Sequence, residues 1–109
     1  MNWTGSLARA DSRRGIQRER DLVNQLRGED WFAMRAPASL GCADVVALRD
    51  GDRPRLIEVK STTAGPYAGF SPADRRDLSF AAKLAGAEAW LCWWPKRSKP
   101  VWIPESDWP

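Results

Sequence analysis

The chain has 109 residues, a formal net charge of +3, two cysteines and no histidine. This length suits one domain with its own hydrophobic core, which we expect at residues 12–109 after an N-terminal arm at residues 1–11. The usual zinc sites and histidine-based acid–base catalysis are excluded, because they need histidine or closely spaced cysteine ligands. The mild basic charge is compatible with a polyanionic partner.

The two cysteines, Cys42 and Cys92, do not form a C-x-x-C pair. So few cysteines predict no disulfide framework. The sequence also contains no apolar signal segment and no stretch of about 20 apolar residues. We therefore expect a soluble protein of the reducing cytoplasm.

A first helix is predicted over residues 12–27, with a serine cap at its start and Gly28 after its end. Glu19 falls in the middle of its apolar seam, where a carboxylate is costly unless it has a partner. Two interpretations stay open: a salt bridge at the edge of the seam, with Arg20 or Lys60, or an acid directed at a catalytic site. The seam itself consists of Ile16, Leu22, Val23 and Leu26.

Short apolar runs bounded by turn residues predict the strands of a sheet. A second helix is predicted over residues 71–85, with Ser71 as its N-cap, Pro72 in its first turn and Gly86 after its end. The predicted order is one helix, three strands, a short strand, a helix and two strands. The strands are expected at residues 31–36, 44–48, 56–60 and 87–94, then 101–103, with the short edge strand at 67–70.

Three charged residues, Asp44, Glu58 and Lys60, interrupt two of the predicted apolar strands. Side chains alternate along a strand, so Glu58 and Lys60 share one face about 6.6 Å apart. A hairpin between the two strands would bring Asp44 close to them. Carboxylates are suitable ligands for Mg²⁺ or Mn²⁺, a bound metal lowers the pKa of water, and a lysine stabilises charge on a phosphoryl group. The pattern therefore contains a minimal metal-dependent nuclease site.

On its own this pattern is a weak signal, because many strands carry Glu-x-Lys on an exposed face. Its place on a hairpin, behind a helix that carries Glu19, strengthens it. Arg13 and Arg14 follow the N-terminal arm, and Arg75 and Arg76 lie in the first turn of the second helix. These arginines are candidates for contact with phosphate, although simple solvation explains them equally well.

Five short blocks resemble the archaeal-type Holliday junction resolvases of the PD-(D/E)xK nuclease superfamily. The resemblance covers about residues 13–94, and Ala43 stands where the superfamily usually has proline. The tryptophan-rich C-terminal end and its basic turn depart from the family. The blocks are Arg14-Gly15, Glu19-Arg20-Asp21, Arg35-Ala36-Pro37-Ala38-Ser39, Asp44-Val45-Val46-Ala47 and Ile57-Glu58-Val59-Lys60-Ser61.

The resemblance implies a restriction-endonuclease-like α/β fold, with a central mixed sheet flanked by helices. It implies a homodimer that binds a four-way DNA junction and nicks two opposed strands symmetrically with Mg²⁺, for which Mn²⁺ can substitute. The implied catalytic residues are Glu19, Asp44, Glu58 and Lys60, with Ser39 beside them, and the three acids hold the metal. The residues expected to contact DNA are Arg13, Arg14, Arg20, Arg35, Tyr67, Arg75, Arg76, Lys96 and Arg97.

The tryptophans Trp90, Trp93, Trp94 and Trp102 are candidates for the dimer interface, because aromatic residues are enriched at interface centres. The alternative is that they fill the core, which strand alternation predicts for half of them. Two other functions remain as alternatives. One is a related nuclease for flap, mismatched or duplex DNA, and the other is a DNA-binding module without catalysis.

Overall fold

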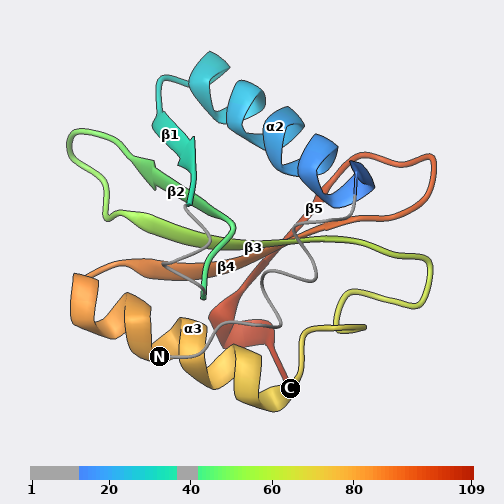
Figure 1. Cartoon of the computed structure of the whole chain (residues 1–109). Helices are drawn as coiled ribbons and strands as arrows, with labels where there is room; N and C mark the ends of the chain where they lie inside the picture. The colour runs from blue at the N-terminus through green and yellow to red at the C-terminus, as the bar shows by residue number, and fades with distance from the viewer. Residues whose placement is uncertain (1–12, 37–41) are drawn as a thin grey trace.

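The computed structural model describes residues 13–36 and 42–109, so the predicted N-terminal arm, the cap Ser12 and the loop residue Ser39 lie outside it. The described elements form one mixed sheet with a helix on each face (Figure 1). They are α2 (Arg13–Gly28), β1 (Phe32–Arg35), β2 (Val45–Leu48), β3 (Arg55–Ser61), α3 (Pro72–Ala85), β4 (Glu88–Trp94), β5 (Val101–Pro104) and the 3-10 helix η2 (Glu105–Asp107).

The five strands lie in the sheet in their sequence order, β1-β2-β3-β4-β5. Only the pair β3–β4 is parallel, and α3 makes the crossover that a parallel pair requires. This topology places the carboxyl ends of β3 and β4 at one end of the sheet, beside the start of β2. We call this end, marked by Lys60, the site end. The α/β fold with a mixed sheet and flanking helices is therefore confirmed.

Helix α2 covers one face of the sheet with the seam that its sequence predicts. Leu22, Val23 and Leu26 are buried against Val45, Ile57 and other residues of the strands. Ile16, at the start of the seam, is only half-buried. The α2 side therefore contains the larger part of the core.

Helix α3 covers the opposite face, where it packs against β3 and β4. Its N-terminus has the predicted capping box: the Ser71 hydroxyl accepts from Asp74 N–H, and the Asp74 carboxylate accepts from Ser71 N–H. The helix ends at Gly86, whose φ of 63° lies in the left-handed region that glycine adopts without strain. Leu78 and Ala82 form its buried face.

One prediction about local structure was wrong. Residues 67–70 form a turn and not an edge strand, and a hydrogen bond from Phe70 N–H to the Tyr67 carbonyl closes it at 2.9 Å. The left-handed φ of 75° at Gly69 ends any extended run there. After β5 the chain forms η2, and behind it Trp108 packs edge-to-face on Phe70 with ring centroids 5.1 Å apart.

The tryptophans of the last two strands belong mainly to the core. Trp90, Trp94 and Trp102 pack against the buried cluster under α2, and Trp90 and Trp102 meet edge-to-face at 5.8 Å. The guanidinium of Arg55 stacks on both of these rings and on Trp31. Trp93 donates its indole N–H to the Thr62 carbonyl at 2.9 Å. The structure thus favours the core interpretation of these residues over a dimer interface.

In the part of the chain that the structure describes, no helix is long and apolar enough to span a bilayer.

Candidate active site

Three charged residues predicted from the sequence meet at the site end of the sheet. Glu58 and Lys60 lie on β3, and Asp44 immediately precedes β2, its antiparallel neighbour. Since Val45 pairs with Ile57, the continued register places Asp44 opposite Glu58. The hairpin therefore brings the two acids together, as its alternation predicts.

Asp44 is fixed to β3 by both its backbone and its side chain. Its N–H donates to the Ile57 carbonyl at 2.9 Å, and its Oδ2 accepts from the Val59 N–H at 2.8 Å. A hydrogen bond from Ala36 N–H to the Asp44 carbonyl ties the same residue to the end of β1 at 2.8 Å. These bonds hold one carboxylate oxygen against the sheet and leave Oδ1 available for another ligand.

Glu58 and Lys60 form a buried ion pair. Lys60 Nζ lies 3.2 Å from Glu58 Oε1, and the two side chains are only 9% and 2% exposed. By strand alternation they share the face of Leu56, which packs in the cluster under α3. An isolated charge in such a place is strongly disfavoured, so the opposite charges of the pair compensate each other. The pair places a carboxylate and an ammonium next to Asp44.

Two further residues lie close to this pair. A Cβ at Gly69 would come 3.5 Å from Lys60 Nζ, so the turn at residues 67–70 approaches the lysine with its backbone. Burial raises the pKa of the Cys42 thiol, and the carboxylates of Asp77 and Glu58 raise it further. These causes place Cys42 at the border of the site. Sequence reasoning missed both residues, although the glycines around position 67 were a turn signal.

Glu19 has a partner that differs from the two predicted ones. Its Oε1 accepts from Arg35 Nε at 2.9 Å, and its side chain is 16% exposed. Arg35 ends β1 and pairs with Val45, which faces α2. Glu19 thus lies at the site end, but on the α2 side of the sheet.

Asp44 and Glu58 are chemically suited to a hard divalent cation. Both are carboxylates, they are adjacent, and Mg²⁺ commonly takes only one or two protein carboxylates and completes its shell with water and phosphate oxygens. Among residues 13–36 and 42–109, no group of three or more aspartates, glutamates or cysteines lies close enough to hold a metal. The third predicted ligand, Glu19, therefore stays a prediction, as does Ser39, which is outside the described residues.

The basic residues predicted to contact DNA divide into two groups. The first group has partners inside the protein. Arg35 is paired with Glu19, and Arg75 donates to the Phe70 carbonyl at 2.6 Å and stacks on the Tyr67 ring at 5.5 Å. The second group is exposed and consists of Arg20, Arg76, Lys96 and Arg97. Arg13 and Arg14 lie in the first turn of α2, and their side chains are outside the described part.

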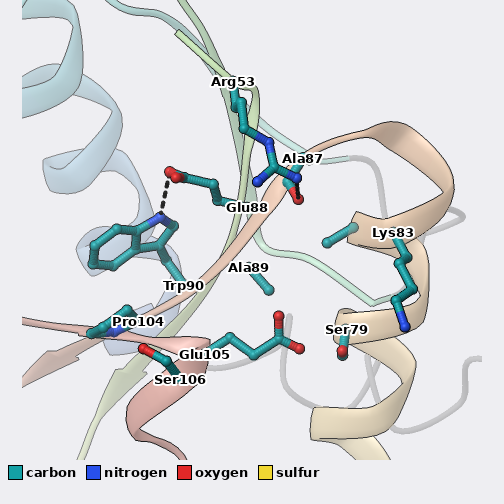
Figure 2. Close-up of a pocket in the computed structure, with 11 residues that line it drawn as sticks. Arg53, Ser79, Lys83, Ala87, Glu88, Ala89, Trp90, Pro104, Glu105 and Ser106 are labelled. Atoms are coloured by element: carbon teal, nitrogen blue, oxygen red, sulfur yellow. Dashed lines mark hydrogen bonds between the residues drawn. The ribbon is translucent and has the colours of Figure 1, made fainter.

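A surface pocket of about 480 Å³ lies at the opposite end of the sheet (Figure 2). Its lining includes Arg53 and Lys83, together with the start of β4 and the end of β5. Arg53 donates to the Ala87 carbonyl there, and Trp90 donates to Glu88. None of the residues predicted for the nuclease site lines this pocket, so the pocket is separate from the candidate active site.

Comparison with known proteins identifies the relatives of this arrangement. The sequence model of the family described as archaeal Holliday junction resolvase (Hjc) matches residues 10–107. The solved structure of Archaeoglobus fulgidus Hjc, a Holliday junction resolvase from an archaeal hyperthermophile, is similar with a TM-score of 0.71 and 27% identity. That match covers 85% of this chain and 74% of the Archaeoglobus chain. A search of curated protein sequences finds no match.

Proposed function

The chain belongs to the archaeal Holliday junction resolvase family, and we propose that it is a metal-dependent endonuclease that resolves four-way DNA junctions by paired, symmetric nicks. The observation that carries the proposal is the meeting of Asp44, Glu58 and Lys60 at one end of the sheet, with Asp44 and the buried pair held in place by β3. A chain with this site and the family's fold has the parts for phosphodiester hydrolysis.

Asp44 and Glu58 would hold Mg²⁺, and Mn²⁺ has the ligand preference to replace it. When bound, such an ion lowers the pKa of water and neutralises a phosphate oxygen. Asp44 presents Oδ1 to the site because Oδ2 is bonded to Val59 N–H. The Lys60 ammonium, 3.2 Å from Glu58, is placed to orient an attacking water or to stabilise charge on the phosphoryl oxygens.

Glu19 is proposed to complete the site from α2. Its Oε1 is engaged by Arg35, and Arg35 lies beside the backbone that carries Asp44. The pair therefore connects α2 to the start of β2 and positions both acids at the site end. Through this contact the first helix becomes part of the catalytic structure.

The exposed residues Arg20, Arg76, Lys96 and Arg97 are proposed to contact the phosphate backbone. Such contacts are independent of sequence and dominate affinity for nucleic acid. Arg35 and Arg75, which have partners inside the protein, are better placed to position Glu19 and the turn at residues 67–70.

We propose that two copies of the chain associate through the α3 side of the molecule. Five large apolar side chains are exposed on this side: Phe32, Met34 and Leu48 on the bare face of β1 and β2, and Phe80 and Leu84 on α3. An exposed apolar surface of this kind commonly marks a protein interface. A two-fold dimer uses the same surface of both copies and fixes the spacing of the two sites.

Replacing Asp44 by asparagine tests the catalytic assignment. Asparagine keeps an oxygen that can accept from Val59 N–H but loses the charge that the metal needs. We expect the variant to bind a synthetic four-way junction and to cut it at least about 100-fold more slowly with Mg²⁺, which corresponds to about 2.7 kcal/mol of lost transition-state stabilisation. Unchanged cleavage by the variant would contradict the proposed site.

Charged substitutions on the α3 side test the dimer. Met34→Asp or Leu84→Asp should yield a monomer in sedimentation equilibrium and uncouple the two nicks. Val101→Asp is the matched control, because Val101 is also exposed but is not among the five residues of the proposed interface. A dimer that survives both substitutions would place the interface elsewhere.

A further inference from the structure

Two adjoining hollows form a groove on the α2 side of the site end. One has a volume of about 720 Å³ and is lined by Arg18 and Gln25 of α2 and by the β4–β5 turn. The other has about 300 Å³ and is lined by Arg18 and by residues 61–63, which follow β3 directly. Arg18, Trp94 and Arg97 line both. We call the combined hollow the turn groove.

The rim of the turn groove is basic. The β4–β5 turn contributes Lys96, Arg97 and Lys99, all exposed, with Arg97 at the left-handed φ of 58°. The fourth cation, Arg18, stacks on the Trp94 ring at 4.9 Å and pairs with Asp21 at 3.4 Å. The three cations of the turn have no acid opposite them among the residues that line the groove.

The floor of the turn groove offers hydrogen-bonding groups beside the cations. Ser61, Thr62 and Thr63 line it. The indole N–H of Trp94 is buried at its wall and has no acceptor among the described residues. A buried donor in this condition is typical of a group whose partner is water or a ligand. Cations with hydroxyl and N–H donors are the groups that bind phosphate oxygens.

The turn groove and the residues Asp44, Glu58 and Lys60 share one end of the sheet but lie on opposite faces. Ser61 follows Lys60 and pairs with Trp94, which packs on the α2 side, whereas Lys60 pairs with Trp93 and faces the α3 side. A straight duplex over Lys60 runs along one face only. A second arm that leaves a branch point can cross the end of the sheet and enter the groove.

From this geometry we infer that the turn groove binds the phosphate backbone of a second DNA arm and so favours branched over linear DNA. The inference rests on the proposed function. It adds that the turn groove is the part of the protein that distinguishes branched from linear DNA. The rings of Trp94 and Trp102 are engaged by Arg18 and by Trp90, so the contact is with phosphates and not by base stacking. The binding is therefore independent of base sequence.

The test compares two pairs of substitutions, each of which removes two positive charges. Both are made in the Asp44→Asn variant, which we expect to bind a junction without cutting it. Arg97→Gln with Lys99→Gln removes two cations of the groove. Arg53→Gln with Lys83→Gln removes two exposed cations at the opposite end of the sheet. Affinity for a four-way junction and for a linear duplex of the same arm sequence is measured at several salt concentrations. Thermal melting confirms that each chain is folded.

We expect the groove pair to weaken junction binding by roughly 10- to 100-fold at about 0.1 M salt and to reduce the slope of log K against log salt by about 2. Duplex binding and the control pair should change less than about threefold. The inference is overturned if both pairs weaken junction binding equally. It is also overturned if the groove pair weakens junction and duplex binding equally, or if it does not weaken junction binding at all. In these three cases the parent still binds the junction, so the proposed function stands. A parent that fails to prefer the junction overturns both.

Discussion

Replacing Lys60 by methionine removes the ammonium that pairs with the buried carboxylate of Glu58 and keeps an unbranched side chain of similar length. The two charged atoms lie 3.2 Å apart, and the side chains are 9% and 2% exposed. At an effective dielectric constant of about 20, two charges at this separation attract by about 5 kcal/mol. Loss of one member of a buried pair typically costs about 3–5 kcal/mol, because the other keeps its buried charge and loses this counter-charge. We expect this loss in Lys60→Met.

For a domain of this size, that loss corresponds to a fall in Tm of about 12–20 °C. It is measured by thermal and denaturant unfolding at neutral pH. The double variant Glu58→Gln, Lys60→Met is the control, because it leaves no buried charge at the pair. We expect it to be more stable than Lys60→Met alone. Together with the single variant Glu58→Gln it completes a double-mutant cycle, which isolates the interaction between the two residues.

Addition of Mg²⁺ connects this stability measurement to the proposed site. A cation held by Asp44 and Glu58 supplies the counter-charge that Lys60→Met lacks, so Mg²⁺ should raise the Tm of this variant more than that of the parent chain. The double variant should gain less than either. A stability loss below about 1 kcal/mol in Lys60→Met, the size of an exposed ion pair, would refute the reasoning about burial. An equal gain from Mg²⁺ in all three chains would refute the reasoning about the metal.

The remaining predictions concern three other contacts. Glu19→Gln should abolish junction cleavage. It should lower the free energy of unfolding by only about 1–2 kcal/mol, because the partner of Glu19, Arg35, is partly exposed. Retained cleavage would make Glu19 a structural residue only. Asp77→Asn should lower the raised pKa of Cys42. Because only the thiolate reacts, alkylation of Cys42 by iodoacetamide at a fixed pH near 8 should become faster, and an unchanged rate would contradict the influence of Asp77. Ser71→Ala should lower the free energy of unfolding by about 1 kcal/mol in urea titrations, and a neutral result would show that the cap does not stabilise α3.

The sequence by itself determined the features that depend on neighbours along the chain. The extent of α3 follows from the capping box at Ser71 and the left-handed glycine at its end, both of which are local signals. The meeting of Asp44 with Glu58 and Lys60 follows from alternation in two strands joined by a short turn. The five motif blocks predicted the family, and the match over residues 10–107 confirms it.

Only the tertiary structure decided which groups far apart in the sequence meet. Nothing local indicates that Glu19 would bind Arg35 and not Arg20 or Lys60, since that choice depends on how α2 crosses β1. The same holds for Gly69 beside Lys60, where a strand was predicted and a turn is found.

The tryptophans show the limit of strand periodicity most clearly. Alternation assigned half of them to the core, yet Trp90, Trp94 and Trp102 all pack against it, because all three point to the face of the sheet that α2 covers. The turn groove depends on the same packing: Arg18 reaches the Trp94 ring only after α2 has settled on the sheet. Local propensity and alternation fix the elements and the face of each side chain, whereas contacts across elements depend on the packing of the whole chain.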